Sequence, residues 1–419
     1  MKKRLQSILT VLALIFMFGC SQKTETMEKT AAEILGNPNY LAISYGGYRE
    51  NTREIQPTIE ELKEDMRILH AMGVKILRTY NVQLQQAPNL LEAISQLKKE
   101  NSSFEMYVML GVWIDCQNAW TELEPNHEVE SEANAGEIDR AVALAKKYPK
   151  IVKIIAVGNE AMVRWAASYY VQPNVILKWV NHLQKLKKSG DLSKDVWITS
   201  SDDFSSWGGG DHSYRTSDLE KLIKAVDYVS MHTYPMHNTF YNPAFWEVPE
   251  DEINLSDGEK IEAAMLRASD FAKKQYEAVS EYVKSLDVEK PIHIGESGWT
   301  TFSNGHYGAG NSKAADEYKA GVYYKQLRKW TNKAGISCFY FEAFDESWKD
   351  SVNPLGSENH FGLINLKGEA KYALWEMVDN GVFDGLKRGG FPITKTYDGD
   401  KKALMKDVLA PPLLDKFNK

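Results

Sequence analysis

The sequence lacks the features that would support a metal site, a disulfide framework or binding to nucleic acid. Its 419 residues include only 3 cysteines, Cys20, Cys116 and Cys338, and no pair of them has the spacing of a zinc site. The 9 histidines are scattered, and the formal net charge of −7 argues against a nucleic-acid partner. We therefore expect no metal and no nucleic acid. A bridge between Cys116 and Cys338 stays open, although a buried thiol is the favoured interpretation for Cys338.

The sequence also lacks an interdomain linker. No stretch rich in Pro, Gly and Ser interrupts the chain after residue 40. Without such a break, the length suits one large barrel better than two ordinary domains. We therefore predict a single domain over residues 37–419.

The N-terminal segment has the pattern of a secretion signal. Met1–Leu5 is rich in positive charge, and the apolar run Ile8–Phe18 is too short to span a bilayer. A glycine directly precedes Cys20, which resembles a bacterial lipoprotein signal. We expect residues 1–19 to be removed and the mature chain to begin at a lipid-bearing Cys20; an ordinary secretory signal with an incidental cysteine is the alternative. Residues 20–36 are polar and predict a flexible tether.

Lipid on Cys20 predicts a cell-envelope protein, anchored in the outer membrane of a Gram-negative bacterium and touching the membrane only through that anchor. Radioactive palmitate should label the wild-type protein and leave Cys20→Ala unlabelled, because the thiol is the attachment point. Equal labelling of both proteins would contradict this prediction.

Eight short apolar, β-rich runs alternate with amphipathic stretches along the chain. The runs are bounded by turn residues and have the length of buried strands. The predicted strands are Tyr40–Tyr45, Val74–Tyr80, Phe104–Ile114, Ile151–Val157, Val196–Ser200, Val226–His232, Pro291–Gly295 and Ile336–Phe344.

The amphipathic stretches between these runs predict helices. The clearest begins at Thr58, which can cap a helix, keeps apolar residues at helical spacing from Ile59 to Leu69, and ends at Gly73. Further helices are predicted over Glu137–Lys147, Asn174–Lys188, Lys260–Leu286, Ala314–Thr331 and Lys371–Met377.

Strands and helices in this alternation predict an α/β fold, a (β/α)₈ TIM barrel. A doubly wound open sheet would give the same alternation, but it needs a Gly-rich phosphate loop after its first strand. Tyr45–Arg49 is too short and too bulky for that loop. The segment Met236–Asp257 is too irregular for a simple connection, and we expect it to form an insertion over the barrel mouth.

Two glutamates each close a predicted strand. Glu160 ends the run that begins at Ile151, and Glu296 ends the run that begins at Pro291. The apolar run argues for burial while the charge argues against it. The conflict is resolved if both strands end at the catalytic rim of a barrel, where two facing carboxylates can cleave a glycosidic bond.

Other polar and aromatic side chains also follow the predicted strands, and in a barrel these positions converge on one pocket. Carboxylates, amides, tyrosines and tryptophans at one rim suit a sugar chain. They are Arg49, Arg78, Tyr80, Asn81, Trp113, Asp115, Asn159, Asp202, Asp203, His232, Tyr234, Trp299, Glu342, Asp345, Glu346, Trp348 and Lys349.

Several of these residues have a purely structural interpretation as well. Trp113 and Trp299 suit packing in the core or rim as much as stacking on a sugar. His232 suits a satisfied polar residue of the barrel. Asp202 and Asp203 suit solvated loop charges.

Read together, the motifs resemble glycoside hydrolase family 17. They are Val157–Glu160, Tyr234-Pro235, Gly295–Trp299, and Phe344–Lys349 followed by His360–Leu363. That family comprises retaining (β/α)₈-barrel enzymes acting on β-1,3-glucans, and the resemblance covers about residues 40–375. It implies a laminarin-like β-glucan as the substrate.

The resemblance implies a role for each matching residue. Glu160 is similar to the general acid/base and Glu296 to the nucleophile. Asn159 would hold the sugar 2-hydroxyl, and Tyr234 would touch the glucan or orient Glu296. No cofactor takes part in this chemistry. The candidate substrate-binding residues are Tyr45, Arg78, Tyr80, Asn81, Trp113, Asn159, Tyr234, Trp299, Glu342, Glu346 and Lys349.

This chain departs from the plant members of the family at a few positions. Ser297 stands where they usually have Thr, and Thr300 where they have Pro. Phe341-Glu342 resembles bacterial and fungal relatives more closely. These differences leave the chemistry unchanged but leave chain-length preference and transglycosylation open.

We expect a monomeric endo-β-1,3-glucanase, and three alternatives remain. A β-1,3-glucanosyltransferase would use the same residues, a glycan-binding lipoprotein would use the barrel as a platform, and another hydrolase would act on a different β-glucan or a mannan. The subsites that distinguish these substrates are expected in Met236–Asp257, whose aromatic residues are Phe240, Tyr241, Phe245 and Trp246.

Overall fold

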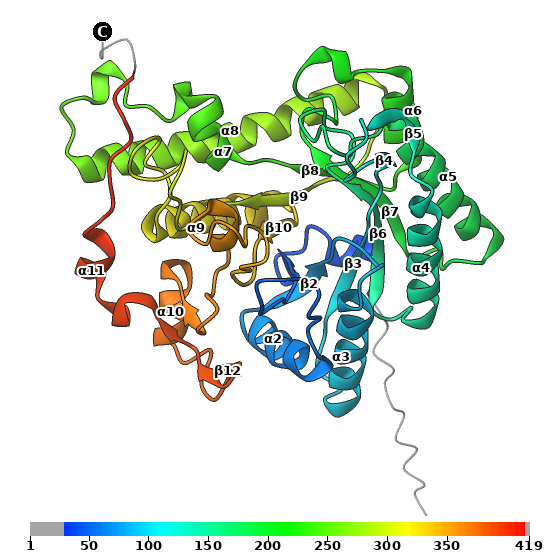
Figure 1. Cartoon of the computed structure of the whole chain (residues 1–419), viewed down its shortest axis with the longest axis horizontal. Helices are drawn as coiled ribbons and strands as arrows, with labels where there is room; N and C mark the ends of the chain where they lie inside the picture. Colours follow the sequence, from blue (N-terminus) through cyan, green and yellow to red (C-terminus); the bar gives the residue numbers. More distant parts are fainter. Residues whose placement is uncertain (1–28, 415–419) are drawn as a thin grey trace, which may run out of the picture.

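The computed structural model of the protein describes residues 29–414. Eight parallel strands close into a barrel, as the sequence predicts (Figure 1). The barrel closes where Ile43 pairs with Tyr340. In chain order the strands are β1 (Leu41–Ser44), β2 (Val74–Arg78), β3 (Tyr107–Val112), β6 (Val152–Asn159), β7 (Trp197–Asp203), β8 (Val229–His232), β9 (Ile292–Gly298) and β10 (Cys338–Phe341).

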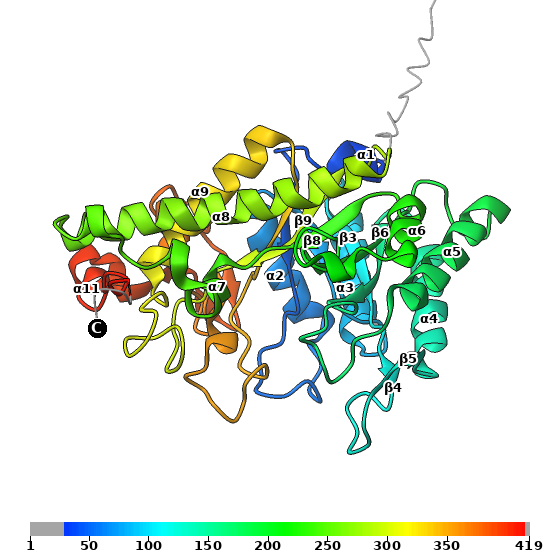
Figure 2. The same cartoon turned by 90° about the horizontal axis from the view of Figure 1, so that it is seen from above.

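Helices surround the barrel (Figures 1 and 2). The Thr58 hydroxyl accepts the amide of Glu61 and begins α2, which buries Leu62, Met66 and Leu69 as its apolar spacing predicts. The other long helices are α3 (Gln86–Glu100), α4 (Ala133–Lys147), α5 (Pro173–Ser189), α6 (Ser217–Ala225), α8 (Asp257–Ser285) and α9 (Glu317–Ala334), with α2 spanning Ile59–Ala71.

Two of these helices were not predicted. No side chain caps the start of α3, and Pro88 lies in its first turn. α6 has only 9 residues, although Thr216 caps its start and Leu219, Leu222 and Ile223 keep helical spacing. The predicted helix Lys371–Met377 is a 3₁₀ turn, η5 (Tyr372–Leu374), followed directly by a short α-helix, α10 (Trp375–Asp379).

The loops at the carboxyl ends of the strands carry additional elements. A hairpin of β4 (Cys116–Gln117) and β5 (Asn126–Glu130) follows β3. The predicted irregular insertion contains α7 (Pro235–Tyr241) and the short turns η2 (Pro243–Phe245) and η3 (Glu250–Glu252). Cys116 and Cys338 are both buried free thiols, so the two do not form a bridge.

The first described residues close the opposite end of the barrel. Helix α1 (Ala31–Ile34) begins with a capping box between Thr30 and Glu33 and buries Ala31 and Ile34 completely. These side chains join a cluster with the barrel-interior residues Ile76 and Phe339. The predicted tether is therefore too long: its described part, residues 29–36, is largely packed, because its few apolar side chains find the barrel floor. Cys20 and the predicted signal peptide lie outside the described residues.

The C-terminal segment packs along one side of the barrel (Figure 1). Its elements are β11 (Glu369–Ala370), β12 (Lys387–Arg388), β13 (Phe391–Pro392), β14 (Thr394–Lys395), η6 (Thr396–Gly399) and α11 (Lys401–Met405). β12 and β13 form a hairpin, and β12 lies against α2. Within residues 29–414, no helix has both the length and the apolar character needed to cross a membrane.

Candidate active site

A cavity of about 1420 Å³ opens at the carboxyl ends of the barrel strands. Parallel strands bring their ends to one rim, so side chains far apart in sequence converge there. Most of the predicted site residues line this cavity. They are Tyr45, Tyr80, Asn81, Trp113, Asn159, Glu160, Tyr234, Glu296, Glu346 and Lys349.

The two glutamates face each other across a short gap. Glu160 directly follows β6 and has a positive φ of 47°, while Glu296 lies within β9. One carboxylate oxygen from each and one ring nitrogen of His232 all lie within 4.8 Å of one another. This limit of 4.8 Å is nearer to the separation of a retaining pair, about 5–5.5 Å, than to that of an inverting pair, roughly 6.5–9.5 Å.

The environment of Glu296 keeps it ionised. Arg78, from β2, forms an ion pair with it, and the Tyr234 hydroxyl donates a 2.7 Å hydrogen bond to Oε2. Burial alone would raise the pKa of Glu296, but His232, Arg78 and Tyr234 outweigh burial and lower the pKa to about 2. Glu296 is therefore a carboxylate at neutral pH.

Glu160 has the opposite electrostatic setting. Burial, followed by the negative charges of Glu296 and Asp203, raises the pKa of Glu160 well above its usual value, and Arg78 only partly opposes this. Two neighbouring carboxyl groups with separated pKa values are the pattern of an acid and an ionised partner. Glu160 can thus hold a proton while Glu296 is charged.

His232 connects the two glutamates, a role that the sequence did not distinguish from that of a structural barrel residue. Its Nδ1 lies 3.0 Å from Oε1 of Glu160 and 3.8 Å from Oε2 of Glu296, and its Nε2 lies 2.8 Å from the Ser201 hydroxyl. Burial lowers the pKa of His232 to about 4. The sequence signal that could have indicated this role is the position of His232 at the end of a predicted strand.

The triad of Glu160, His232 and Glu296 is also the group of side chains, among residues 29–414, that could share a metal ion. Arg78 already contributes a positive charge to Glu296 and donates to the amide oxygen of Asn159. Arg78 thus supplies to Glu296 the positive charge that a bound cation would otherwise supply.

Three predicted substrate-binding residues do not line the cavity. Arg78 is 1% exposed and lies behind Glu296. Glu342 is 1% exposed and accepts a 2.6 Å hydrogen bond from Lys349. Trp299 is wholly buried, and its indole N–H donates to the Ala314 carbonyl. Each of these side chains is buried among other residues of the protein, so their contact with substrate stays a prediction.

Of the two aspartates that end β7, Asp202 is not solvated, contrary to the sequence interpretation, and Asp203 is partly exposed. Asp202 is wholly buried and accepts a 2.7 Å hydrogen bond from the Met162 amide. Burial raises its pKa to about 7. Asp203 lines the cavity, and its charge contributes to the raised pKa of Glu160. Both residues therefore belong to the electrostatics of the site.

Two exposed tryptophans that were not predicted, Trp120 and Trp165, line the cavity together with the predicted Trp113. Trp120, from the β4–β5 hairpin, is 62% exposed and stacks on Tyr169 at 5.0 Å, and Trp113 lies 5.2 Å from the same tyrosine. Trp165, 65% exposed, also lines the cavity. We call Trp113, Trp120 and Trp165 the Trp120 wall. Trp120 and Trp165 lie further along the loops than the residues that directly follow each strand, so selecting residues at strand ends could not find them.

The predicted aromatic insertion contributes less than expected. Tyr241 lines the cavity. Phe240 instead stacks on His306, and Phe245 on Phe271. Trp246 is wholly buried. Three of the four aromatic residues serve packing because the segment folds back on its own neighbours.

Known proteins resemble this chain in sequence and in fold. Residues 42–362 match the model of the BtgE/BtgC glycoside hydrolase domain. The chain belongs to this glycoside hydrolase family. The resemblance of its motifs to β-1,3-glucan-active glycoside hydrolases is thereby confirmed.

Solved structures show how closely this family member resembles known folds. The crystal structure of an endo-laminarinase from Formosa Hel1_33_131 is 65% identical, with a TM-score of 0.91, and covers 92% of this chain and 98% of that chain. A glycoside hydrolase family 17 β-1,3-glucanosyltransferase from Rhizomucor miehei is 19% identical, with a TM-score of 0.55, over 80% of this chain and 96% of that one. The second likeness shows the fold alone.

Two curated relatives of this glycoside hydrolase are fungal proteins. A putative glucan endo-1,3-beta-glucosidase of Aspergillus niger is 23% identical over 325 residues, which are 74% of this chain and 39% of that relative. A glucan 1,3-beta-glucosidase of Arthroderma benhamiae is 27% identical over 276 residues, 63% of this chain and 70% of that protein. The chain thus spans well under half of the Aspergillus relative.

The buried imidazole gives a prediction that needs no substrate. In NMR spectra, the His232 ring should stay neutral until the pH falls to about 4, and His232→Asn should remove its signals. Burial also lowers the pKa of His293 to about 4, so the signals that disappear in His232→Asn are needed to tell the two rings apart. Because the folded-state pKa lies below 6.5, this group should lower the free energy of unfolding as the pH falls from 6.5 to about 4. Titration of the His232 ring near 6.5 would contradict the prediction.

Proposed function

We propose that this protein is a retaining endo-β-1,3-glucanase that cleaves laminarin-like glucans. The observation that carries the proposal is the pair Glu160 and Glu296, with opposite pKa shifts and oxygens within 4.8 Å. The 65% identity to an endo-laminarinase over nearly all of both chains supports the substrate. The glucan-active names of the fungal relatives agree with it.

In the proposed mechanism, ionised Glu296 attacks the anomeric carbon while Glu160 protonates the departing glycosidic oxygen. Arg78 and Tyr234 hold the Glu296 carboxylate in place. A covalent glycosyl–enzyme results. Water, deprotonated by Glu160, then attacks the same anomeric carbon and releases Glu296.

The charge of Glu296 controls when Glu160 acts as an acid and when it acts as a base. While Glu296 is ionised, its charge helps to keep the proton on Glu160. Esterification removes that charge, which lowers the pKa of Glu160 after its proton has left with the leaving group. Glu160 then accepts a proton from water.

Aromatic surfaces on different loops suit the sugar units flanking the bond to be cleaved. The Trp120 wall exposes large ring faces along the cavity. Tyr48 and Trp348, whose rings lie 5.7 Å apart, line it from the loops after β1 and β10; we call them the Trp348 wall. Rings of this kind pack against the apolar faces of glucose units. A cavity open at its rim suits cleavage within a chain.

Transglycosylation remains the second candidate, since an acceptor sugar can replace the water. The likeness to the Rhizomucor glucanosyltransferase is at 19% identity and speaks only for the fold. The closer likeness to an endo-laminarinase favours hydrolysis. We further propose that the enzyme is a monomer and is lipid-anchored through Cys20, on the sequence pattern given above.

The substrate proposal is tested by incubating the purified protein with laminarin, lichenan, pustulan and mannan. Short β-1,3-linked oligosaccharides should appear from laminarin, and NMR should show the β-anomer as the first product. Products longer than the starting oligosaccharide, at high substrate concentration, would assign the protein as a transferase. Activity on mannan without activity on laminarin would overturn the substrate.

The roles of the two glutamates are tested with dinitrophenyl glucosides, whose leaving group needs no proton. Glu160→Ala should lose roughly 10²–10⁴-fold on laminarin but keep much of its first step on the activated substrate. Added azide should then accelerate it and give a β-glycosyl azide. Glu296→Ala should be inactive on laminarin, and azide should give the α-azide by direct displacement. Reversed azide products would exchange the two roles.

A further inference from the structure

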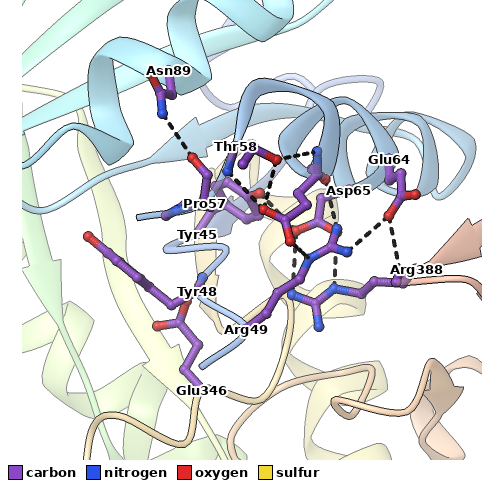
Figure 3. Close-up of polar contacts among 12 residues, drawn as sticks. Tyr45, Tyr48, Arg49, Pro57, Thr58, Glu64, Asp65, Asn89, Glu346 and Arg388 are labelled. Carbon is purple, nitrogen blue, oxygen red and sulfur yellow. Dashed lines mark hydrogen bonds and ion pairs between the residues drawn. The ribbon is translucent and has the colours of Figure 1, made fainter. Parts of the chain in front are cut away.

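A buried carboxylate outside the catalytic centre joins three distant parts of the chain (Figure 3). Asp65, on α2, is wholly buried. Its oxygens accept hydrogen bonds from the Tyr45 hydroxyl at 2.9 Å, Arg49 at 3.1 Å and Arg388 Nε at 3.0 Å. A buried carboxylate is costly unless it is paired, so these donors are held firmly around it.

Arg388 belongs to the C-terminal hairpin, outside the residues 42–362 that match the family model. Its side chain is 1% exposed, and its guanidinium carbon lies 4.1 Å from the centroid of the Phe344 ring. The next amide, that of Gly389, donates a 3.0 Å hydrogen bond to Glu64 on the same helix. The hairpin is thus pinned to α2 at adjacent residues.

Asp65 is connected to the cavity through the loop after β1. Tyr45 and Gly46 both line the cavity. A Cβ at Gly46 would lie 2.3 Å from a carboxylate oxygen of Glu346, and one at Gly47 would lie 2.3 Å from the Tyr45 hydroxyl. Gly46 and Gly47 therefore lie between the Tyr45 ring and the Glu346 carboxylate in close contact with both. A shift of the Tyr45 ring would displace the backbone of these two glycines.

Glu346 connects the loop after β1 to the Trp348 wall by hydrogen bonds. It accepts 3.0 Å hydrogen bonds from the Tyr48 amide and from the Trp348 indole N–H. Figure 3 shows Glu346 beside Tyr48, with Asp65 and Arg388 to their right in this view. Arg53 covers the Trp348 ring at 4.3 Å. The ring faces of this wall therefore depend on the backbone position that Asp65 fixes.

We propose that Arg388 is a positioning residue, through which the C-terminal hairpin holds the Trp348 wall in register for the glucan chain. This inference rests on the proposed β-glucanase function. Arg388 acts through Asp65 and the loop after β1, and touches no reacting atom. The reacting glutamates are held by other residues, Arg78, Tyr234 and His232. The hairpin should therefore govern glucan binding and leave the chemical step unchanged.

The test compares Arg388→Met, which keeps much of the side-chain volume but loses the charge, with Arg388→Lys, which restores a charge without the planar fork. The control is Lys187→Met. Lys187 is also nearly buried and pairs with Asp227 at 2.7 Å between α5 and the start of β8, away from the cavity. Enzyme activity and hydrogen–deuterium exchange are measured for each variant at the same number of degrees below its own thermal unfolding midpoint.

In the steady state, Arg388→Met should raise KM for laminarin by roughly tenfold, the effect of losing about one buried hydrogen bond, while kcat stays within about twofold. The kcat for hydrolysis of a dinitrophenyl glucoside should be unchanged, because Arg388 contacts neither reacting glutamate. Arg388→Lys should recover part of the loss. Lys187→Met should keep the wild-type KM. A fall in kcat at constant KM, or the same KM change in Lys187→Met, would overturn the proposal.

Hydrogen–deuterium exchange tests the same idea without any substrate. Arg388→Met should speed exchange in the peptides that contain Tyr48 and Trp348 and leave the ends of β6 and β9 unchanged. Uniform acceleration, or none, would overturn the proposal. If the wild-type enzyme fails to cleave laminarin, the proposed function fails, but exchange still decides the role of Arg388. If Arg388→Met does not fold, the same measurements on Arg388→Lys decide it, with a smaller change expected in the same peptides.

Discussion

The chemistry of this site depends on the ion pair between Arg78 and Glu296. Two carboxyl groups with oxygens within 4.8 Å of each other repel if both are ionised. Arg78 breaks the symmetry between them: it bonds to Glu296 and only partly offsets the forces that raise the pKa of Glu160. Tyr234 adds a hydrogen bond on the same side. One proton is thereby placed on one residue before any substrate arrives.

The barrel is what makes this asymmetry possible. Arg78 ends β2, His232 ends β8, and Glu296 lies in β9, so residues more than 200 positions apart in sequence meet at one rim. Glycines make room between them. A Cβ at Gly295 would lie 2.3 Å from the hydroxyls of Ser201 and Ser230, beside the His232 ring. Close strand packing and the polar site are thus parts of one arrangement.

The strand pattern and the strand-end glutamates could be predicted because both follow local rules: apolar runs form buried strands, and a charge at the end of such a run needs a functional reason. Local rules cannot predict the direction in which a side chain points. Trp299 directly follows β9, the strand that contains Glu296, yet its ring is buried in the core, while Trp120 reaches the cavity from a hairpin. His232 looked like an ordinary barrel residue because its partners lie on other strands.

Helix α1 and the cavity lie at opposite ends of the barrel. α1 packs among side chains at the amino-terminal ends of the strands, and its neighbour Gly36 donates a hydrogen bond to Ser337, just before β10. Figure 2 shows α1 on the edge of the molecule opposite the β4–β5 hairpin that borders the cavity. An enzyme tethered through residues that precede α1 would present its cleft away from the bilayer. A long polysaccharide could then slide through the cleft without meeting the lipid surface.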